Sequence, residues 1–191
     1  MNEQSMQELV RQAISPARFC HVEGVVQTAD ELARRFGVDP DQARQAAWAH
    51  DYAREWPVDR WYEVAKERGV DEQFFAVAEL LHGHIAAAML PELFGIDNED
   101  VANAVRYHTS GRVGMSALEK VVCLADYIEP GRTFPAVEDL RKLAEQDLDL
   151  ALASAFDNTI RFLLDRQKPI FPLTVLARNH LWKEIADRRK L

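Results

Sequence analysis

The sequence predicts an all-α protein, a bundle of packed helices. Apolar residues recur every three or four positions along the chain, and no segment shows the alternation of a strand. Signals for the start and the end of a helix punctuate the same segments. The length of 191 residues, 48% of them hydrophobic, suits one domain with a buried core. We therefore expect a single helical domain over 1–191, because no repeat or break in composition divides it.

A short helix at about 3–13 is expected to precede a longer one that runs from Pro16 to Phe36. Ser15 is placed as the N-cap of the longer helix, with proline at its first position. His21 lies on the apolar stripe of this helix. A histidine on such a stripe is expected to point toward the core.

The next helix opens at the segment 39–42, where Asp39 precedes a proline and a glutamine is placed for a capping box. Alanines follow at helical spacing and end at His50. Small side chains on that face let neighbouring helices approach closely. His50 and the adjacent Asp51 are therefore well placed to reach a centre shared between helices.

Three further helical segments are expected in the middle of the chain. One begins near Pro57, and Asp71 caps another that reaches His82. Gly83 is expected to interrupt that helix, and 84–94 then continues as a short helix of its own.

Asp97 is expected to cap a helix whose buried face ends at His108. Ser116 and Glu119 have the spacing of a capping box. The helix that they start carries Asp126 on the same stripe as its apolar residues. The sequence thus predicts an acidic side chain at a core position.

The segment 129–132 contains Pro-Gly and is expected to stop that helix. Two helices follow, at about 137–145 and 147–166. A connector at 168–172 leads to a last amphipathic helix.

Charge and composition exclude several classes of function. The net charge of −8 argues against binding a nucleic-acid backbone, which requires a basic surface. No apolar run approaches the roughly 20 residues of a membrane span. The N-terminus lacks the layout of a signal peptide, so we expect a cytoplasmic protein. Cys20 and Cys123 lie in apolar helical patterns and are expected to be buried free thiols.

Six polar side chains on these helices predict a metal centre. Any single histidine on an apolar face is more often a hydrogen-bonded core residue. Four imidazoles and two carboxylates together favour a metal between facing helices, because an unpaired buried carboxylate costs several kcal/mol. Nitrogen and oxygen donors without sulfur suit Fe, Mn or Zn. The six residues are His21, His50, Asp51, His82, His108 and Asp126.

The remaining two histidines are weaker candidates. His84 lies next to Gly83, so its orientation relative to His82 is open, and His82 ends the apolar stripe of its helix. His180 belongs to the terminal helix and is expected at the surface or in packing.

The order His, His-Asp, Asp resembles the HD-domain metal-dependent phosphohydrolases. The likeness is closer to the YqeK family, bacterial symmetrical diadenosine tetraphosphate hydrolases, and covers about 18–179. His-Thr-x-Gly-Arg and Glu-Pro-Gly-Arg are specific to that family. The segments that carry the likeness are 18–21, 49–54, 81–83, 107–112 and 125–132.

The resemblance implies a bundle whose metal-site core spans about 16–132, with C-terminal helices at about 137–190 that complete a nucleotide site. Iron, as one or two ions, would be held by His21, His50, Asp51 and Asp126. His82 and His108 would complete a second metal position or contact phosphate. The catalytic set is then Asp51, His82, His108 and Asp126.

The substrate implied by the resemblance is a dinucleoside polyphosphate, cleaved to two ADP by a homodimer. Arginines suit its phosphates because their bonds to phosphate are charge-assisted and bidentate. Arg54 stands where the family usually has Lys, and Ser110 replaces a common Thr. The residues expected to bind substrate are Arg18, Arg54, Thr109, Arg112, Arg132, Phe171, Thr174 and Asn179.

Three alternatives stay open at the level of sequence. An HD-domain phosphohydrolase could act on another nucleotide, and the product distinguishes that case. A di-iron oxygenase would use a similar ligand set, but the arginines favour phosphate. A non-catalytic helical binding module would hold no stoichiometric metal. Trp56, Trp61 and Tyr62 are equally open between core and interface.

Overall fold

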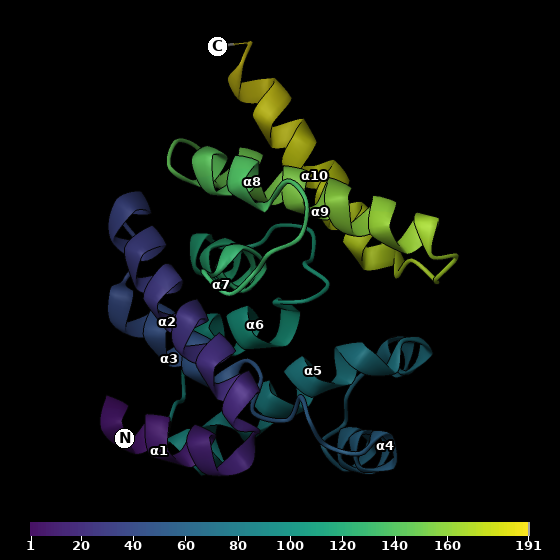
Figure 1. Ribbon diagram of the computed structural model, residues 1–191. Coiled ribbons are helices and arrows are strands. Elements are labelled where there is room, and N and C mark those ends of the chain that lie inside the picture. Colours follow the sequence, from purple (N-terminus) through teal and green to yellow (C-terminus); the bar gives the residue numbers. More distant parts are fainter. Residues whose placement is uncertain (191) are drawn as a thin grey trace.

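The computed structural model describes residues 1–190, which form ten α-helices and no strand (Figure 1). The all-α expectation is therefore confirmed. The helices are α1 (Glu3–Ala13), α2 (Pro16–Phe36), α3 (Pro40–Ala49), α4 (Val58–Glu67), α5 (Leu81–Met89), α6 (Glu99–Tyr107), α7 (Ala117–Ile128), α8 (Val137–Ala144), α9 (Leu148–Asp165) and α10 (Pro172–Arg188). Short helical turns lie at η1 (Glu72–Ala76), η2 (Ala78–Leu80) and η3 (Leu90–Phe94). Among the described residues, no helix combines the length and apolar composition that crossing a bilayer requires.

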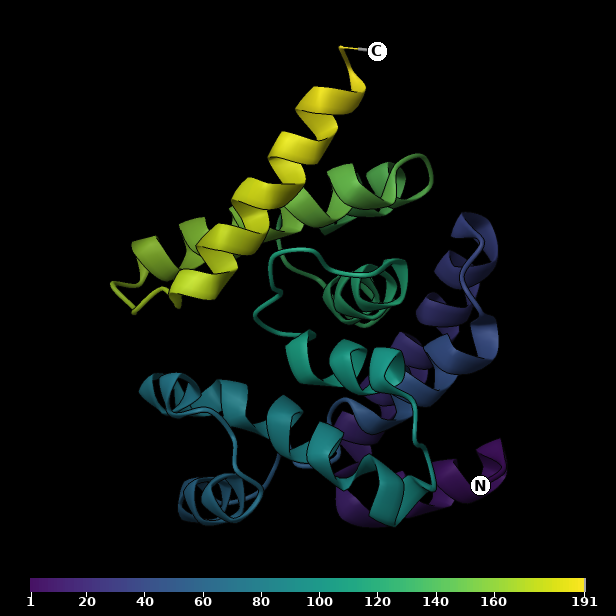
Figure 2. The same cartoon turned by 180° about the vertical axis from the view of Figure 1, so that it is seen from behind.

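Helix α7 occupies the centre of the bundle. It packs against α2, α3 and α6 on one side and against α8 and α9 on the other. Figures 1 and 2 show α8, α9 and α10 stacked above it, whereas α4 and α5 lie below and to one side. A residue on α7 can therefore reach both the lower helices and the upper ones.

Three of the predicted caps, at α2, α3 and α7, place the helix starts correctly. Ser15 accepts a hydrogen bond from the backbone N–H of Arg18, and Asp39 caps α3 in the same manner. Ser116 and Glu119 form the expected capping box at the start of α7. These local bonds satisfy backbone donors that have no partner inside the helix.

Three expectations about helix boundaries are wrong. Asn98, not Asp97, caps α6, because its extended backbone lets the side-chain oxygen accept from the N–H groups of Asp100 and Val101. Gly83 does not interrupt a helix: α5 begins at Leu81 and continues through it. The segment before Leu81, expected to be one helix, consists of two 3-10 turns.

Gly83 is where α5 approaches α6 most tightly. A Cβ at this position would lie 2.9 Å from the carbonyl oxygen of Val105 and 3.1 Å from the ring of His108. A Cβ essentially never lies within 3.0 Å of a backbone oxygen, and the 3.1 Å approach to the ring is also tight, so glycine is the residue that fits here. The glycine therefore brings two histidine-bearing helices together.

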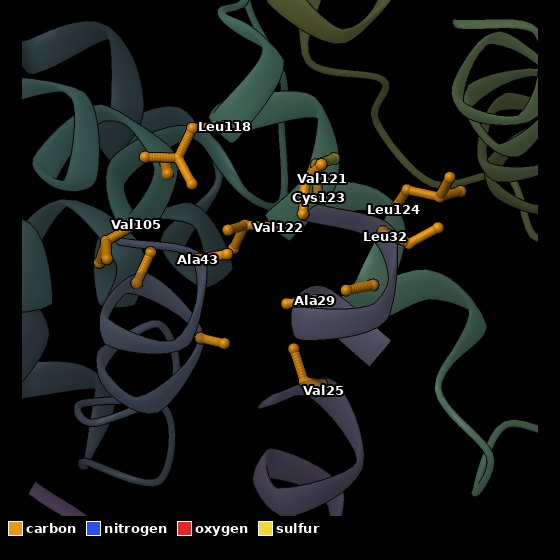
Figure 3. Close-up of a cluster of buried hydrophobic side chains, with 14 of the residues drawn as sticks. Val25, Ala29, Leu32, Ala43, Val105, Leu118, Val121, Val122, Cys123 and Leu124 are labelled. Carbon is orange, nitrogen blue, oxygen red and sulfur yellow. The ribbon is translucent and has the colours of Figure 1, made fainter. Parts of the chain in front are cut away.

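The main core is made of small and branched side chains between α2, α3, α6 and α7 (Figure 3). Val25 and Ala29 of α2, Ala43 of α3 and Val122 of α7 are fully buried. Their small volumes let the helix axes come close, as expected from the alanine-rich stretch. This close packing brings the polar ends of the same helices together.

A second apolar cluster joins α4, the η1 turn and α5 to the segment just before α10. Trp61 lies in this cluster, and its indole N–H donates to the carbonyl of Ala53 at 2.7 Å. Trp56 and Tyr62 pack against it and are half-buried. Trp61 is therefore a core residue.

Of the two cysteines, both free, only Cys123 is buried as expected. Burial raises the pKa of its thiol. Cys20 is exposed, so the expectation for it is wrong. It lies between Phe19, which is buried, and His21, and its own position on α2 faces outward.

The loop between α6 and α7 is fixed by Gly111, which adopts φ +63°. A Cβ there would also lie 2.5 Å from the ring of Phe156 on α9. Gly114 in the same loop has φ +71° but faces open space. A side chain at Gly114 would therefore cause backbone strain alone, whereas one at Gly111 would cause strain and a steric clash.

We predict that Gly111→Ala lowers the free energy of unfolding by about 2–5 kcal/mol, the sum of left-handed strain and overpacking. Gly114→Ala is the matched control and should cost about 1–2 kcal/mol, since it carries strain alone. Urea denaturation followed by circular dichroism measures both. Equal losses would show that the contact with Phe156 is unimportant.

Candidate metal centre

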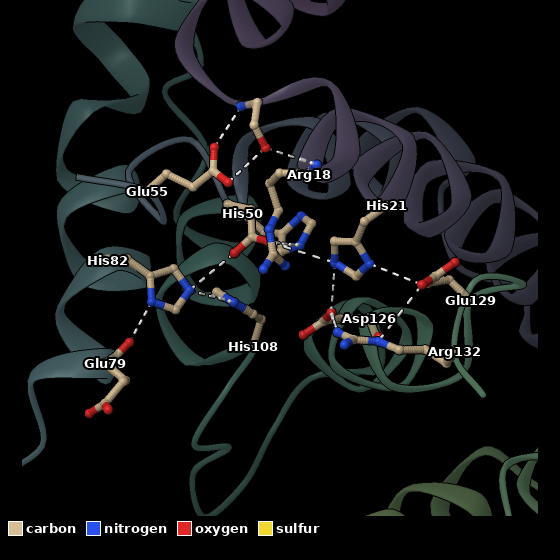
Figure 4. A network of polar contacts seen from close by, with 12 residues as sticks. Arg18, His21, His50, Glu55, Glu79, His82, His108, Asp126, Glu129 and Arg132 are labelled. Carbon is tan, nitrogen blue, oxygen red and sulfur yellow. Dashed lines mark hydrogen bonds and ion pairs between the residues drawn. The ribbon is translucent and has the colours of Figure 1, made fainter. Parts of the chain in front are cut away.

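The six polar residues converge between five helical segments (Figure 4). His21 comes from α2, and Asp126 from the middle helix α7. His50 and Asp51 follow the end of α3, and His108 follows the end of α6. His82 lies in the first turn of α5. The bundle thus brings together side chains that are far apart in the sequence.

One group of donors surrounds His21. Its Nε2 lies 3.1 Å from Oδ1 of Asp126 and 3.6 Å from Oδ2 of Asp51. Nε2 of His50 lies 3.4 Å from the same Asp51 oxygen. With metal–ligand bonds of about 2.0–2.2 Å, neighbouring ligands of one ion lie about 3.0–3.5 Å apart. The spacing therefore fits a cation among these side chains.

A second group lies on the other side of Asp51. Nε2 of His82 is 3.2 Å from Oδ1 of Asp51 and 3.1 Å from Nε2 of His108. Donor atoms of His50, Asp51 and His108 also lie within 4.8 Å of one another. The two oxygens of Asp51 thus face different histidines, which is the arrangement of a carboxylate that bridges two cations.

All four imidazoles are held so that Nε2 faces the centre. Nδ1 of His50 and of His108 lies 2.6 Å and 2.7 Å from the carbonyl oxygens of Ala47 and Val105. His82 bonds the carbonyl of Glu79 in the same way. Since a carbonyl only accepts, Nδ1 carries the proton and Nε2 keeps its lone pair for a metal.

The positions of these histidines follow from helix chemistry. The last carbonyls of a helix have no partner within it. His50 and His108 each follow the last residue of a helix and donate to the carbonyl three residues earlier. The helix ends therefore gain a hydrogen bond while they orient the ligands.

The surroundings of three groups favour the protonation state that can bind a metal, which is ionised for Asp126 and Asp51 and neutral for His108. Burial opposes ionisation of Asp126, but the nearby imidazoles of His21 and His50 and the guanidinium of Arg132 hold its pKa below the usual range. The pKa of Asp51 is likewise well below normal despite burial, chiefly because of His50. Burial, reinforced by His82, lowers the pKa of His108 to about 3.

His50 is the exception. Burial opposes its protonation, yet Asp51 raises its pKa above the usual value. A proton therefore competes with a cation for its Nε2, and binding of a metal there releases that proton.

Two buried nitrogens test whether a cation fits the site. Nε2 of His21 and Nε2 of His50 are buried without a hydrogen-bond partner. Buried polar atoms are nearly always satisfied, so such orphans require an explanation. Both atoms face the carboxylates of Asp51 and Asp126, and the nitrogen and oxygen donors suit a divalent cation. The residues present therefore fit a metal.

Glu129 belongs to this site although sequence reasoning treated it only as part of a helix stop. Its buried carboxylate lies 3.0 Å from Nδ1 of His21 and also accepts from the N–H of Gly131. A Cβ at Gly24 would lie 2.6 Å from this carboxylate, and one at Gly131 would lie 3.0 Å from it. Two glycines thus leave the space that Glu129 occupies. The glycine in the middle of α2 was the sequence signal that could have revealed it.

Two arginines contact the carboxylates of the centre. Arg18 Nη1 lies 3.1 Å from Oδ2 of Asp51. Arg132 Nη2 lies 2.6 Å from Oδ1 of Asp126, and its Nε donates to the carbonyl of the same residue at 2.9 Å. Both guanidinium groups are partly exposed, so each has a face turned to solvent beside the centre.

Two other predicted arginines differ in their surroundings. Arg112 forms a two-pronged pair with the fully buried Glu119, at 2.8 Å and 2.6 Å. That pair anchors the loop before α7. Arg54 is half-buried, three residues beyond Asp51, and its guanidinium forms no ion pair within the described chain.

The remaining predicted substrate residues lie along the entrance to α10 and the loop after α6. Thr109 is exposed. Phe171 is buried against Phe74, with ring centroids 5.3 Å apart, and Thr174 is also buried. Asn179 is exposed and accepts from Arg178 at 3.0 Å. Within the described chain, no side-chain hydrogen bond or ion pair joins these residues to the six donors.

His84 and His180 lie apart from the centre. The ring of His84 packs 3.7 Å from that of Phe74, and burial lowers its pKa to about 3. His180 is half-buried and lies 3.5 Å from Glu184 one turn later. The structure thus places His82, rather than His84, among the six.

Comparison with known proteins also groups the six donors within one known domain. The HD-domain family model matches residues 18–131, the stretch that contains all six donors. A symmetrical bis(5′-nucleosyl)-tetraphosphatase of Bacillus subtilis (strain 168) is 43% identical over 182 residues, covering 95% of this chain and 98% of that protein. The enzyme of the same name from Staphylococcus aureus (strain NCTC 8325 / PS 47) is 30% identical over 183 residues, covering 94% of each.

A crystal structure from Clostridium acetobutylicum, described as a predicted HD superfamily hydrolase involved in NAD metabolism, has a TM-score of 0.92 to this chain. It is 37% identical and the alignment covers 96% of this chain and 98% of that one. The likeness therefore extends to the C-terminal helices beyond the HD-domain match.

We predict that Glu129→Ala weakens binding of Mn²⁺ to the metal-free protein by about 10- to 100-fold, because His21 loses the acceptor that orients it. Glu129→Gln keeps a neutral acceptor and should lose less. Calorimetric titration measures the affinities, with thermal unfolding as a check on folding. The exposed Glu145→Ala, which removes a carboxylate at the end of α8, should bind as the wild type does. Unchanged affinity in Glu129→Ala would contradict this role.

Proposed function

This chain belongs to the HD-domain family of symmetrical bis(5′-nucleosyl)-tetraphosphatases, and from that premise we propose that it hydrolyses diadenosine tetraphosphate to two ADP. The observation that carries the proposal is the centre of four histidines and two aspartates in a chain that is similar to these enzymes over nearly its whole length. One water is consumed at the bond between the second and third phosphorus atoms, so the two products are identical.

The reaction needs charge neutralisation at the phosphates and a nucleophile at neutral pH. Divalent cations held by the six donors would supply both, since they polarise phosphoryl oxygens and lower the pKa of bound water toward about 7. We assign His21, His50, Asp51 and Asp126 to the metal and place His82 and His108 at a second metal position or against phosphate. Asp51, His82, His108 and Asp126 form the proposed catalytic set.

We propose iron as the metal, in one or two ions. The donor set supports a divalent cation in general, and Mn or Zn accepts the same nitrogen and oxygen ligands. The two separate faces of Asp51 favour a pair of ions.

The arginines beside the centre are the proposed phosphate ligands. Arg18 and Arg132 contact Asp51 and Asp126 and keep solvent-facing donors for phosphate oxygens. Arg54 is free to bind an outer phosphate. Arg112 already pairs with Glu119, and we place it at the edge of the site, where its remaining donors face solvent.

The nucleotide ends are assigned to the C-terminal half. We propose that Thr109, Phe171, Thr174 and Asn179 border one nucleoside, so that α8, α9 and α10 complete a single domain with the metal core. A homodimer remains a prediction that rests on the family resemblance, and the cytoplasmic location expected from the sequence also remains a prediction.

A second candidate is an HD-domain phosphohydrolase that acts on another nucleotide. The same centre and arginines would serve it, because they recognise phosphate rather than the base. A binding module without activity is disfavoured by the complete donor set.

We predict that the protein loaded with Fe²⁺ or Mn²⁺ converts diadenosine tetraphosphate to ADP alone, as resolved by anion-exchange chromatography. Asp126→Ala should lower both metal content and turnover by more than about 100-fold, beyond the usual effect of an outer-shell residue. Asp139→Ala, an exposed carboxylate on α8, is the matched control.

The outcomes separate the candidates. AMP with ATP would preserve the centre but overturn symmetrical cleavage. Turnover of other nucleotides without any from diadenosine tetraphosphate would favour the second candidate. Full activity in Asp126→Ala would remove the metal hypothesis.

A further inference from the structure

A cavity of about 560 Å³ lies beside the metal centre, between the segment after α7 and helix α9. Its lining includes Tyr127, Arg132 and Phe134 from the first segment and Asn158 and Phe162 from α9. Pockets that hold small organic ligands measure roughly 300–1,000 Å³. The space therefore suits a nucleoside.

Arg132 connects this cavity to the metal centre. One of its nitrogens lies 2.6 Å from Oδ1 of Asp126, a proposed metal ligand, while the same side chain lines the cavity. A second bond, from Nε to the carbonyl of Asp126, fixes the guanidinium in place. A phosphate chain that passes Arg132 thus has reacting phosphates on one side and the cavity on the other.

The lining has the chemistry of a purine site. The rings of Tyr127 and Phe134 meet edge to face, with centroids 5.0 Å apart, and form a rigid aromatic wall. Phe162 is 53% exposed, although a large apolar ring is usually covered. Bases stack on aromatic faces, and the amide of Asn158 matches the N6/N7 edge of adenine.

The loop that closes the cavity is held in an unusual conformation. Ala136, a lining residue, adopts φ 71°, which residues with a Cβ rarely occupy. Such strain tends to persist at ligand-binding segments, where the surroundings hold it in place. The segment between Arg132 and α8 therefore holds a defined conformation beside the cavity.

We propose that this cavity binds one adenosine of the dinucleotide, with Arg132 holding the phosphate that links it to the metal centre. The proposal deepens the proposed function and rests on it. It assigns Phe162 and Asn158 to the base, and it leaves the region of Phe171 and Thr174 for the other half of the substrate.

The test compares Phe162→Ala with Leu164→Ala. Leu164 is 60% exposed on the same helix but does not line the cavity, so it is a matched control. Because Phe162 is itself exposed, its removal should leave the fold intact, which thermal unfolding checks. Both variants and the wild type are loaded with Mn²⁺ and assayed on diadenosine tetraphosphate, and inhibition by pyrophosphate is measured.

Phe162→Ala should raise the KM for diadenosine tetraphosphate by about 5- to 150-fold, the range for a lost base stack. Its kcat should stay within about twofold, because the lost interaction is uniform binding. Inhibition by pyrophosphate, which has no base, should not change. Leu164→Ala should match the wild type in every constant.

Photolabelling of the wild type with 8-azido-ADP gives a second readout without substitution. It should mark peptides that contain 132–136 or 158–165, and absence of label from both would overturn the proposal. Unchanged KM in Phe162→Ala, or a changed oligomeric state with unchanged KM, would also overturn it. Wild type that forms no ADP contradicts the proposed function instead, so the two failures are distinguishable.

Discussion

The buried carboxylate of Asp51 is the constraint around which the other polar residues are arranged. Only 3% of this residue is exposed, and a lone charge at that depth would cost several kcal/mol. Its two oxygens face Nε2 of His50 on one side and Nε2 of His82 on the other. Arg18 closes the solvent side. The carboxylate is tolerated at this depth because nitrogens of Arg18, His50 and His82 lie 3.1 Å, 3.4 Å and 3.2 Å from its two oxygens.

The histidines of the centre are oriented by two different devices. His50, His82 and His108 use backbone carbonyls three residues earlier, so helix turns supply their partners. His21 lies in the middle of a helix, where the carbonyls are already bonded, and it uses Glu129 instead. A carboxylate makes the ring a more basic ligand than a carbonyl does. His21 is therefore oriented by a carboxylate, whereas the other three histidines are oriented by backbone carbonyls.

Helix α7 and the segment after it link metal chemistry to substrate binding. Asp126 points toward the metal centre, and Tyr127 lines the adjacent cavity. Glu129 then orients His21, and Arg132 returns to the carboxylate of Asp126. The seven residues 126–132 thus include a proposed metal ligand, the carboxylate that orients His21 and part of the cavity wall. A shift of this helix end would disturb all three together.

What the sequence determined by itself was local. Helix positions, the Ser116–Glu119 capping box and the six donors follow from spacings of three or four residues, because such contacts form within one turn. Gly83 was misjudged because its reason is a carbonyl on another helix. Glu129 was missed because it acts on a residue 108 positions away. Whether Arg112 pairs with Glu119 or faces solvent, and which faces enclose a cavity, depend on how helices pack, and only the tertiary structure decides such contacts.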